Sequence, residues 1–271
     1  MITLEETKKL LLEIHSKYGY NMINYDLSFS QKTIVKTMKS FNKANYEDFR
    51  AYILNDEMLI KEMFGNFFIN VSWMFRDPEV FKKIREDIIP ILASYPRIKI
   101  WSAGCATGEE AYSMAILLRE AGLFERSIIY ATDIDEYALN RAEKATYKLQ
   151  SSLQFVENYY LSGGTEKFSD YFTIKKNEMV LDPSLSEIIC FAEHNLINDT
   201  SFNEFQLILC RNLFIYFDQN LQSHAVSTFD ASLERGGFFI SGKYEHLKGI
   251  GIESRFQEYD KKNKIYKKVI R

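Results

Sequence analysis

Residues 98 to 110 read Ile98-Lys99-Ile100-Trp101-Ser102-Ala103-Gly104-Cys105-Ala106-Thr107-Gly108-Glu109-Glu110. An apolar run is followed by a turn of small residues and then by a helical pattern that continues to Glu120. This order is typical of an α/β sheet that binds a ligand beyond the carboxyl end of its first strand. The stretch therefore predicts an α/β fold and the place of a ligand site. The alternative is a plain strand–helix turn whose following acids merely suit the helix dipole.

The turn also indicates the charge of the ligand. It has the form Gly-x-Ala-x-Gly from Gly104 to Gly108, rather than the three-glycine fingerprint of dinucleotide-binding proteins. Two acids, Glu109 and Glu110, follow directly. A pyrophosphate at this helix N-terminus would face both acids, whereas a cationic ligand would be favoured. Only 12 glycines occur in 271 residues, so two of them in one turn indicate close approach of the backbone to a ligand.

The chain divides into two parts around this stretch. Residues 1–92 carry apolar residues at helical spacing, which predicts an all-α N-terminal domain. In residues 93–271, short apolar runs alternate with helical patterns, which predicts a mostly parallel sheet covered on both faces. Residues about 161–186 break the alternation and predict a small antiparallel β insert. The predicted helices of the second part are 109–120, 135–144 and 218–233, and its strands are 97–101, 127–131, 188–192, 205–209, 237–242 and 264–270, the last two close enough to pair antiparallel.

One predicted helix of the first part, residues 30–43, has two contrasting faces. Its apolar side chains share one face, and Ser30 is expected to be its N-cap. The opposite face carries a stripe of four lysines: Lys32, Lys36, Lys39 and Lys43. Such a stripe is either a solvated helix face or a docking surface for an acidic partner. A later helix is predicted to run from Asp77 as N-cap and Pro78 as first helical residue to about residue 91.

Composition excludes several classes of protein. The chain has 34 Lys+Arg against 37 Asp+Glu, a formal net charge of −3, which argues against a non-specific nucleic-acid binder. Its three cysteines are far apart and form no CxxC pair, so no disulfide framework or zinc site is predicted and a reducing, cytoplasmic compartment is expected. The first residues lack the apolar core of a signal peptide, and no apolar run is long enough to span a membrane.

Polar residues follow other predicted strands at the point where each strand ends. Asp133 comes about 25 residues after the glycine turn, a spacing that suits hydrogen bonds to ribose hydroxyls. Asp135 is expected to cap the next helix instead. Asn195 follows a third strand, and Arg211 and Asn212 follow a fourth. Because the carboxyl ends of parallel strands meet at one edge of a sheet, we expect these side chains to border a common site.

A further polar group lies inside an aromatic stretch just before the α/β region. The stretch reads Asn70-Val71-Ser72-Trp73-Met74-Phe75-Arg76. By themselves, Asn70, Ser72 and Arg76 fit the capped end of a helix as well as they fit a ligand-binding element.

Together these motifs resemble the CheR family, S-adenosylmethionine-dependent methyltransferases that esterify glutamates of bacterial chemoreceptors. The resemblance covers about residues 20–245, and its motifs lie at 70–76, 101–113, 132–135, 195–196 and 210–217. Ser72 replaces the family's threonine, and Ala111 stands where the family more often has proline. Residues 242–245 read Gly-Lys-Tyr-Glu instead of Gly-His-Ser-Glu. The insert shows no match to the surface with which some members bind a receptor's C-terminal peptide.

The resemblance implies a Rossmann-like class I methyltransferase domain at 93–271, preceded by the helical domain 1–92 as a substrate-docking domain. It implies S-adenosyl-L-methionine as the cofactor, S-adenosyl-L-homocysteine as the product, and no metal. Glu110 would receive the methionyl ammonium, Asp133 the ribose, and Arg76 and Tyr216 are the implied catalytic residues. The implied cofactor-binding residues are Asn70, Ser72, Arg76, Ala103, Gly104, Glu110, Asp133, Asn195, Leu196, Arg211 and Asn212.

The implied partner is the cytoplasmic helical domain of methyl-accepting chemotaxis receptors, with neither nucleic acid nor membrane insertion involved. The four-lysine stripe would then dock glutamate-rich receptor helices. Two alternatives remain open from the sequence. One is a methyltransferase that acts on another protein, a small molecule or a nucleic acid, although Arg211-Asn212-Leu213-Phe214 stands where an amino-directed nucleic-acid methyltransferase would have an Asp-Pro-Pro-Tyr type motif. The other is a non-catalytic module that binds S-adenosylmethionine and signals by protein contact.

Overall fold

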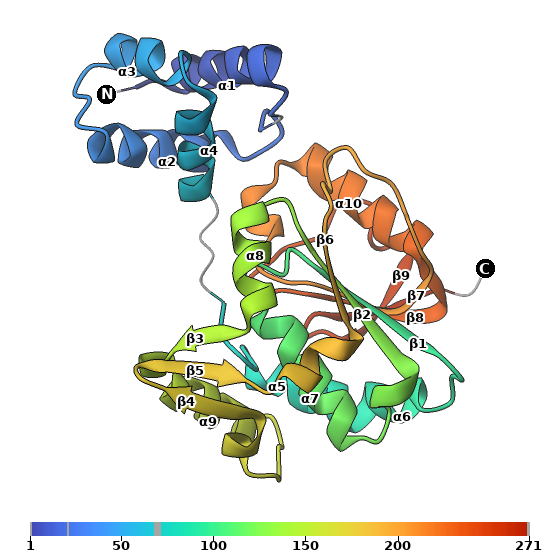
Figure 1. Cartoon of the computed structure of the whole chain (residues 1–271). Helices are drawn as coiled ribbons and strands as arrows, with labels where there is room; N and C mark the ends of the chain where they lie inside the picture. Colours follow the sequence, from blue (N-terminus) through green and yellow to red (C-terminus); the bar gives the residue numbers. More distant parts are fainter. Residues whose placement is uncertain (1, 21, 68–71, 270–271) are drawn as a thin grey trace.

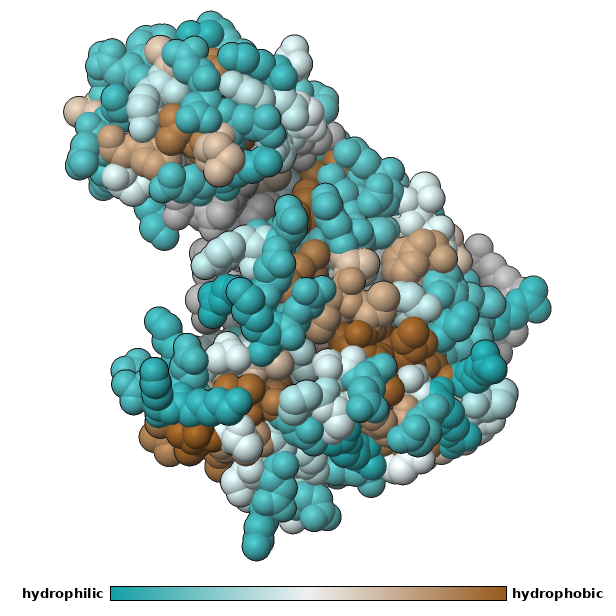
Figure 2. Space-filling model, viewed as in Figure 1, coloured by the Kyte–Doolittle hydropathy of each residue, from teal (hydrophilic) through white to brown (hydrophobic). Residues whose placement is uncertain are grey.

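A computed structural model describes residues 2–20, 22–67 and 72–269, and it begins with a separate group of four helices (Figure 1). These helices are α1 (Leu4–Tyr18), α2 (Leu27–Ser40), α3 (Tyr46–Ile53) and α4 (Glu57–Phe67). Thr3 and Glu6 form a capping box at the start of α1, and Gly19 ends this helix with a φ of +81°. In Figure 2 the same helices form a lobe set apart from the larger body, and its visible face is mostly hydrophilic.

Helix α2 differs from its prediction at both ends. Its N-cap is Asp26, whose carboxylate accepts a hydrogen bond from the Phe29 N–H at 2.7 Å. Ser30 is therefore not a cap but a buried residue inside the helix. The helix ends at Ser40, so Lys43 lies beyond it, with its Nζ 4.2 Å from the centroid of the Tyr52 ring. The other three members of the four-lysine stripe, Lys32, Lys36 and Lys39, lie on the helix and are exposed.

The larger body is built on a seven-stranded sheet in the order β6-β2-β1-β7-β8-β10-β9. The strands from β6 to β8 pair parallel with their neighbours, whereas β10 pairs antiparallel with both β8 and β9. This confirms the predicted parallel sheet with an antiparallel end. The bounds are β1 (Ile98–Ala103), β2 (Ser127–Asp133), β6 (Ile189–Glu193), β7 (Phe205–Cys210), β8 (Leu233–Ser241), β9 (Phe256–Asp260) and β10 (Ile265–Lys268).

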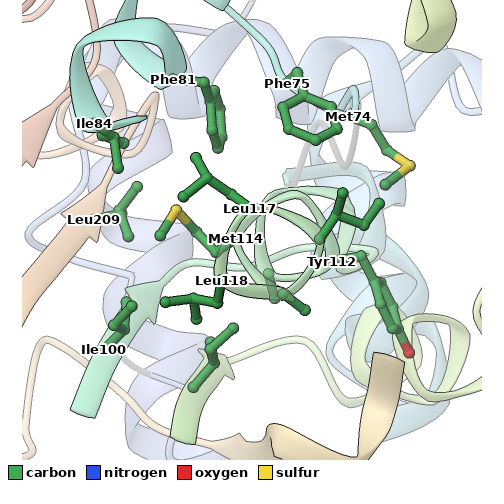
Figure 3. Packing of buried hydrophobic residues seen from close by; sticks show 14 of the residues in the cluster. Met74, Phe75, Phe81, Ile84, Ile100, Tyr112, Met114, Leu117, Leu118 and Leu209 are labelled. Atoms are coloured by element: carbon green, nitrogen blue, oxygen red, sulfur yellow. The ribbon is translucent and has the colours of Figure 1, made fainter. Parts of the chain in front are cut away.

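Helices cover both faces of the sheet, as predicted. Buried residues of α10 pack with Trp101 and Ile208 on one face, and those of α7 pack with Ile100 and Leu209 on the other. Figure 3 shows Met114, Leu117 and Leu118 of α7 beside Ile100 and Leu209. The helix bounds are α7 (Glu109–Glu120), α8 (Glu136–Lys144) and α10 (Gln219–Ser232), and Asp135 and Asp218 are the N-caps of the last two.

The helix predicted from residue 77 to about 91 is present but interrupted. It comprises α5 (Pro78–Lys83), a π-helical turn (Ile84–Ile88) and α6 (Ile89–Leu92). Phe81 and Ile84 pack into the same core as α7 (Figure 3). Residues 78–92 therefore belong physically to the core of the sheet, while a domain boundary between residues 92 and 93 stays a prediction.

The antiparallel insert is a three-stranded sheet in the order β3-β5-β4. Its strands are β3 (Thr146–Lys148), β4 (Phe172–Lys175) and β5 (Glu178–Leu181), and α9 (Ser152–Leu161) lies between β3 and β4 in the chain. The insert therefore begins near residue 146, earlier than predicted. Strand β3 is too short to show an alternating pattern, and it is fixed by pairing with β5 about 30 residues later.

Paired backbone hydrogen bonds join the helical group to the larger body. Tyr25 and Phe217 form an isolated antiparallel bridge. The Asp26 N–H donates to the Tyr216 carbonyl at 2.8 Å, and the Asp218 N–H donates to the Asn24 carbonyl at 2.9 Å. Within the described part of the chain, no helix is both long and apolar enough to cross a membrane.

Candidate active site

A cavity of about 190 Å³ opens at the carboxyl ends of β1, β2 and β7. Most of the residues predicted to bind a cofactor line it: Ser72, Arg76, Gly104, Glu110, Asp133, Asn195, Leu196, Arg211 and Asn212, together with Tyr216. Ala103 does not line the cavity but is buried at the end of β1. Asn70 lies outside the described residues. The fold thus brings together residues spread over about 145 positions of the sequence, as the topology of the parallel sheet predicts.

The glycine turn is held against the end of β2. Gly104 and Cys105 both donate their N–H groups to the Thr132 carbonyl, at 2.8 and 2.9 Å. Gly104 has a φ of +74°, and a Cβ at this position would lie 2.9 Å from the Leu213 side chain. Another residue at position 104 would therefore be strained and would press on the loop after β7. The turn keeps free backbone surface at the cavity wall.

Asp133 holds the turn from the other side. Its Oδ2 accepts a hydrogen bond from the Ala106 N–H at 2.8 Å, and its Oδ1 accepts one from the Asp135 N–H at 3.0 Å. Burial raises the pKa of Asp133 to about 6, although these two backbone bonds favour the carboxylate form. The carboxylate faces the cavity with lone pairs left over, so it retains the capacity to accept further hydrogen bonds from a ligand.

Glu110 belongs to a charge cluster that includes Arg211 and Asp77. Arg211 Nη1 donates to Glu110 Oε2 at 3.0 Å, and Arg211 Nη2 donates to Asp77 Oδ2 at 2.7 Å. Ser102 Oγ donates to the other oxygen of Glu110 at 2.8 Å. The side chain of Arg211 is only 2% exposed, so the guanidinium is shielded from solvent. Two carboxylates around one guanidinium leave a formal charge of −1, which a cationic ligand would balance.

Two acids of this region use their carboxylates within the protein. Asp77 stands at the N-cap position of α5 with Pro78 as the first helical residue, as predicted, but its carboxylate makes no cap hydrogen bond and binds Arg211 instead. Glu109, the other acid after the glycine turn, does not line the cavity. Its two oxygens accept from Thr107 Oγ1 at 2.9 and 2.7 Å, and Ser72 also hydrogen-bonds to it. Burial raises the pKa of Glu109, and of this pair only Glu110 lines the cavity.

Asn195 and His194 lie beyond the end of β6. Asn195 Oδ1 accepts from the Ile197 N–H at 2.9 Å, which fixes a local turn and holds the amide at the cavity. The His194 ring lies 5.1 Å from the Trp101 and Phe202 rings, centroid to centroid. Its packing thus supports the wall of the cavity.

A residue of the helical group packs against Tyr216. Phe29 of α2 packs against it with ring centroids 4.7 Å apart. Burial raises the pKa of the Tyr216 phenol, and the charge of Arg76 opposes this rise. Tyr25 and Trp73 also line the cavity, and the sequence reasoning missed them. Nothing local to Tyr25 signals its role, because it reaches the site through its backbone bridge with Phe217.

The strand order, the glycine turn and the acidic wall of the cavity fit an S-adenosylmethionine-dependent methyltransferase, and a family match shows this class. The family model "CheR methyltransferase, SAM binding domain" matches residues 70–265. The chain belongs to this family, and S-adenosylmethionine is its cofactor.

Relatives of this chain match its sequence over most of its length. A Pseudomonas putida KT2440 protein named "Putative methyltransferase Cher3" is 39% identical over 263 residues, which cover 97% of this chain and 96% of the relative. The chemotaxis protein methyltransferase of Listeria innocua is 28% identical and covers 84% of this chain and 85% of the relative. A solved methyltransferase from Geobacter sulfurreducens in complex with S-adenosyl-L-homocysteine aligns with a TM-score of 0.35 and 12% identity, over 63% of this chain and 49% of that one. This last likeness is too distant to bear on function.

Proposed function

We propose that this chain methylates glutamate side chains of bacterial chemoreceptors and thereby adjusts their signalling in the cytoplasm. The charge layout of the cavity carries the proposal: the acids Glu110 and Asp133 suit a cationic cofactor, and the cation Arg76 suits an anionic substrate. Two relatives named chemotaxis protein methyltransferase, from Listeria innocua and Borreliella burgdorferi, support the same substrate class.

The acidic residues of the cavity suit the cofactor in charge. When bound, S-adenosylmethionine supplies an electrophilic methyl group on a positively charged sulfur. Glu110, within a cluster of formal charge −1, would accept the methionyl ammonium, and Asp133 would accept the ribose hydroxyls. Ser72 would contact the cofactor from the segment before α5. Leu196, Asn195 and the Arg211-Asn212 pair would border the adenosine and methionyl ends, with Gly104 at the cavity wall beneath them.

The substrate needs orientation rather than deprotonation. A glutamate carboxyl has a reference pKa of about 4.3 and is already an anion at neutral pH. Arg76 would orient this carboxylate for in-line attack, and Tyr216 would donate a hydrogen bond near the transferring methyl group. Exclusion of water by Tyr25, Trp73 and the aromatic loop after β7 would strengthen these interactions. The exposed lysines of α2, with Lys43 beside them, would dock the glutamate-rich receptor helices.

The direct test is methyl transfer to a receptor fragment. The full chain is incubated with S-adenosylmethionine tritiated on its methyl group and the cytoplasmic helical domain of a chemoreceptor. We expect incorporated label that alkali releases as methanol, because a glutamate methyl ester is base-labile. A fragment with alanine at its methylation glutamates is the matched control and should stay unlabelled. Alkali-stable label in nucleic acid, a small molecule or another protein side chain, or cofactor binding without any transfer, would contradict the proposal.

A further inference from the structure

The segment that presents Arg76 to the cavity has an unusual backbone. Phe75 has a φ of +52° and Asp77 a φ of +56°, so the residues on both sides of Arg76 are left-handed. Neither is glycine, and this conformation is disfavoured for residues that carry a Cβ. Such backbone persists only where surrounding contacts over-determine it. The contacts that hold residues 74–77 therefore decide where Arg76 lies.

The N-terminal side of the segment is anchored in the core. Asn158 Nδ2 donates to the Met74 carbonyl at 3.0 Å. The Phe75 N–H donates to Ser113 Oγ at 2.8 Å. The Phe75 ring is fully buried and packs edge-on against Phe81, with centroids 5.3 Å apart (Figure 3). None of these three contacts involves the cavity charges.

The C-terminal side is anchored in a different way. Arg211 Nη2 donates to the Arg76 carbonyl and to Asp77 Oδ2, both at 2.7 Å. The other nitrogen of the same guanidinium, Nη1, binds Glu110. The buried guanidinium thus ties the Arg76 turn to the acid proposed to hold the cofactor. Asp77 is 21% exposed at its side chain and lies at the edge of the cluster.

We propose that Asp77 is a positioning residue that holds the Arg76 turn in its strained, transfer-competent form through Arg211. The inference rests on the proposed function of Arg76 in glutamate methylation. Without the Asp77 carboxylate, Arg211 keeps Glu110 and the neutral Arg76 carbonyl but loses its charged partner on the turn. The anchors at Met74 and Phe75 remain, so the fold survives while the backbone at residues 76 and 77 relaxes. A displacement of about 1 Å at a reacting group lowers a rate by roughly 100-fold.

The test compares Asp77→Ala with the wild-type chain in three measurements. Single-turnover transfer at saturating cofactor should fall by about 10–100-fold. The Kd for S-adenosylhomocysteine, measured by calorimetry, should rise by a smaller factor than the rate falls, because Glu110 is retained although the cluster loses one negative charge. Hydrogen exchange of a peptide covering residues 72–80 should speed up, because the bond from the Arg76 N–H to the Trp73 carbonyl depends on the turn. Asp77→Asn keeps one acceptor oxygen and should recover most of the rate.

Asp182→Ala is the matched control, because it removes a carboxylate from a partly exposed arginine pair, Arg119–Asp182, that does not line the cavity. It should leave transfer and exchange at residues 72–80 unchanged. Unchanged exchange and rate in Asp77→Ala would overturn the inference, as would equal loss of transfer, cofactor binding and melting temperature. If the wild-type chain methylates no glutamate, the proposed function fails, and the exchange measurement still decides whether Asp77 holds the turn.

Discussion

Two walls of the cavity are built by different physical means. The strand-end wall, Gly104–Ala106 with Asp133, is held by hydrogen bonds from the N–H groups of the turn to the Thr132 carbonyl and to the Asp133 carboxylate. The turn wall, residues 72–77 with 211–216, is held by a buried guanidinium whose partner Asp77 is 134 positions away in the sequence. The acceptors of the first wall follow β1 and β2 directly, whereas the second wall depends on an ion pair between side chains far apart in the sequence. We therefore expect changes in the first to act on cofactor affinity and changes in the second to act on transfer.

The largest effect is expected for Arg76→Ala in the turn wall, which tests whether this wall acts on methyl transfer rather than on cofactor affinity. Loss of the cation that orients the substrate carboxylate should lower the rate at saturating cofactor by about 1000-fold. Calorimetry with S-adenosylhomocysteine should show an affinity within about fivefold of wild type. If transfer and cofactor binding are lost together, Arg76 supports the structure of the site and the two walls are not separable.

Asp133→Ala in the strand-end wall should have the opposite signature. A hydrogen bond to a charged group contributes about 1.5–3 kcal/mol, so the cofactor should bind roughly 10–100-fold more weakly. The rate at saturating cofactor should change much less, since Asp133 is assigned to the ribose and not to the reacting atoms. An unchanged Kd by calorimetry would remove the ribose assignment.

The pH dependence of cofactor binding is a second test of the role of Asp133. Burial raises the pKa of Asp133 to about 6 in the folded chain, and a cationic cofactor beside it favours the carboxylate and lowers this pKa. Below pH 6, cofactor binding therefore releases a proton. As the pH is lowered through this range, the affinity for the cofactor should fall by up to about tenfold per pH unit, whereas above pH 7 it should not change with pH.

Asp133→Asn, measured over the same pH range, is the control and should bind with little pH dependence. If the cofactor affinity of Asp133→Asn still falls at low pH, the titrating group is Glu245 instead. Burial raises the pKa of Glu245 to about 7. Glu245 accepts hydrogen bonds from the Phe214 and Gly242 N–H groups and supports the loop of the turn wall.

The smallest expected effect lies outside both walls, on α2. Charge reversal of Lys32, Lys36 and Lys39 to glutamate should raise the KM for a receptor fragment by about three- to tenfold in low salt, with kcat unchanged. The effect should shrink at 0.5 M salt, because screening weakens exposed charges. An unchanged KM in low salt would leave these lysines as a solvated face.

The sequence predicts the strand-end wall better than the turn wall. Helix α7 has its predicted bounds, and Asp135 caps α8 as expected, because these features depend on residues within one turn of each other. Asp77 followed by Pro78 has the local signature of a helix cap, yet its carboxylate binds Arg211. No local pattern reports an ion pair over such a distance.

The same limit applies to the helical group. Asp26 and Ser30 are both good N-caps by residue type, and the structure uses the first because Asp26 also bonds to the Tyr216 carbonyl through its N–H. Tyr25 reaches the cavity through a backbone bridge to Phe217, and no local sequence pattern at either residue predicts this bridge. Contacts between the two parts of the chain are therefore what sequence reasoning misses here.

The place of β1 in the sheet has a consequence for synthesis of the chain. β1 lies between β2, which begins at Ser127, and β7, which begins only at Phe205. A growing or truncated chain that stops before residue 205 leaves one edge of this central, apolar strand unpaired, and such edges promote aggregation. The cofactor cavity, which needs Arg211 and Asn212, closes later still. The glycine turn thus becomes a binding site only after about four-fifths of the chain has been made.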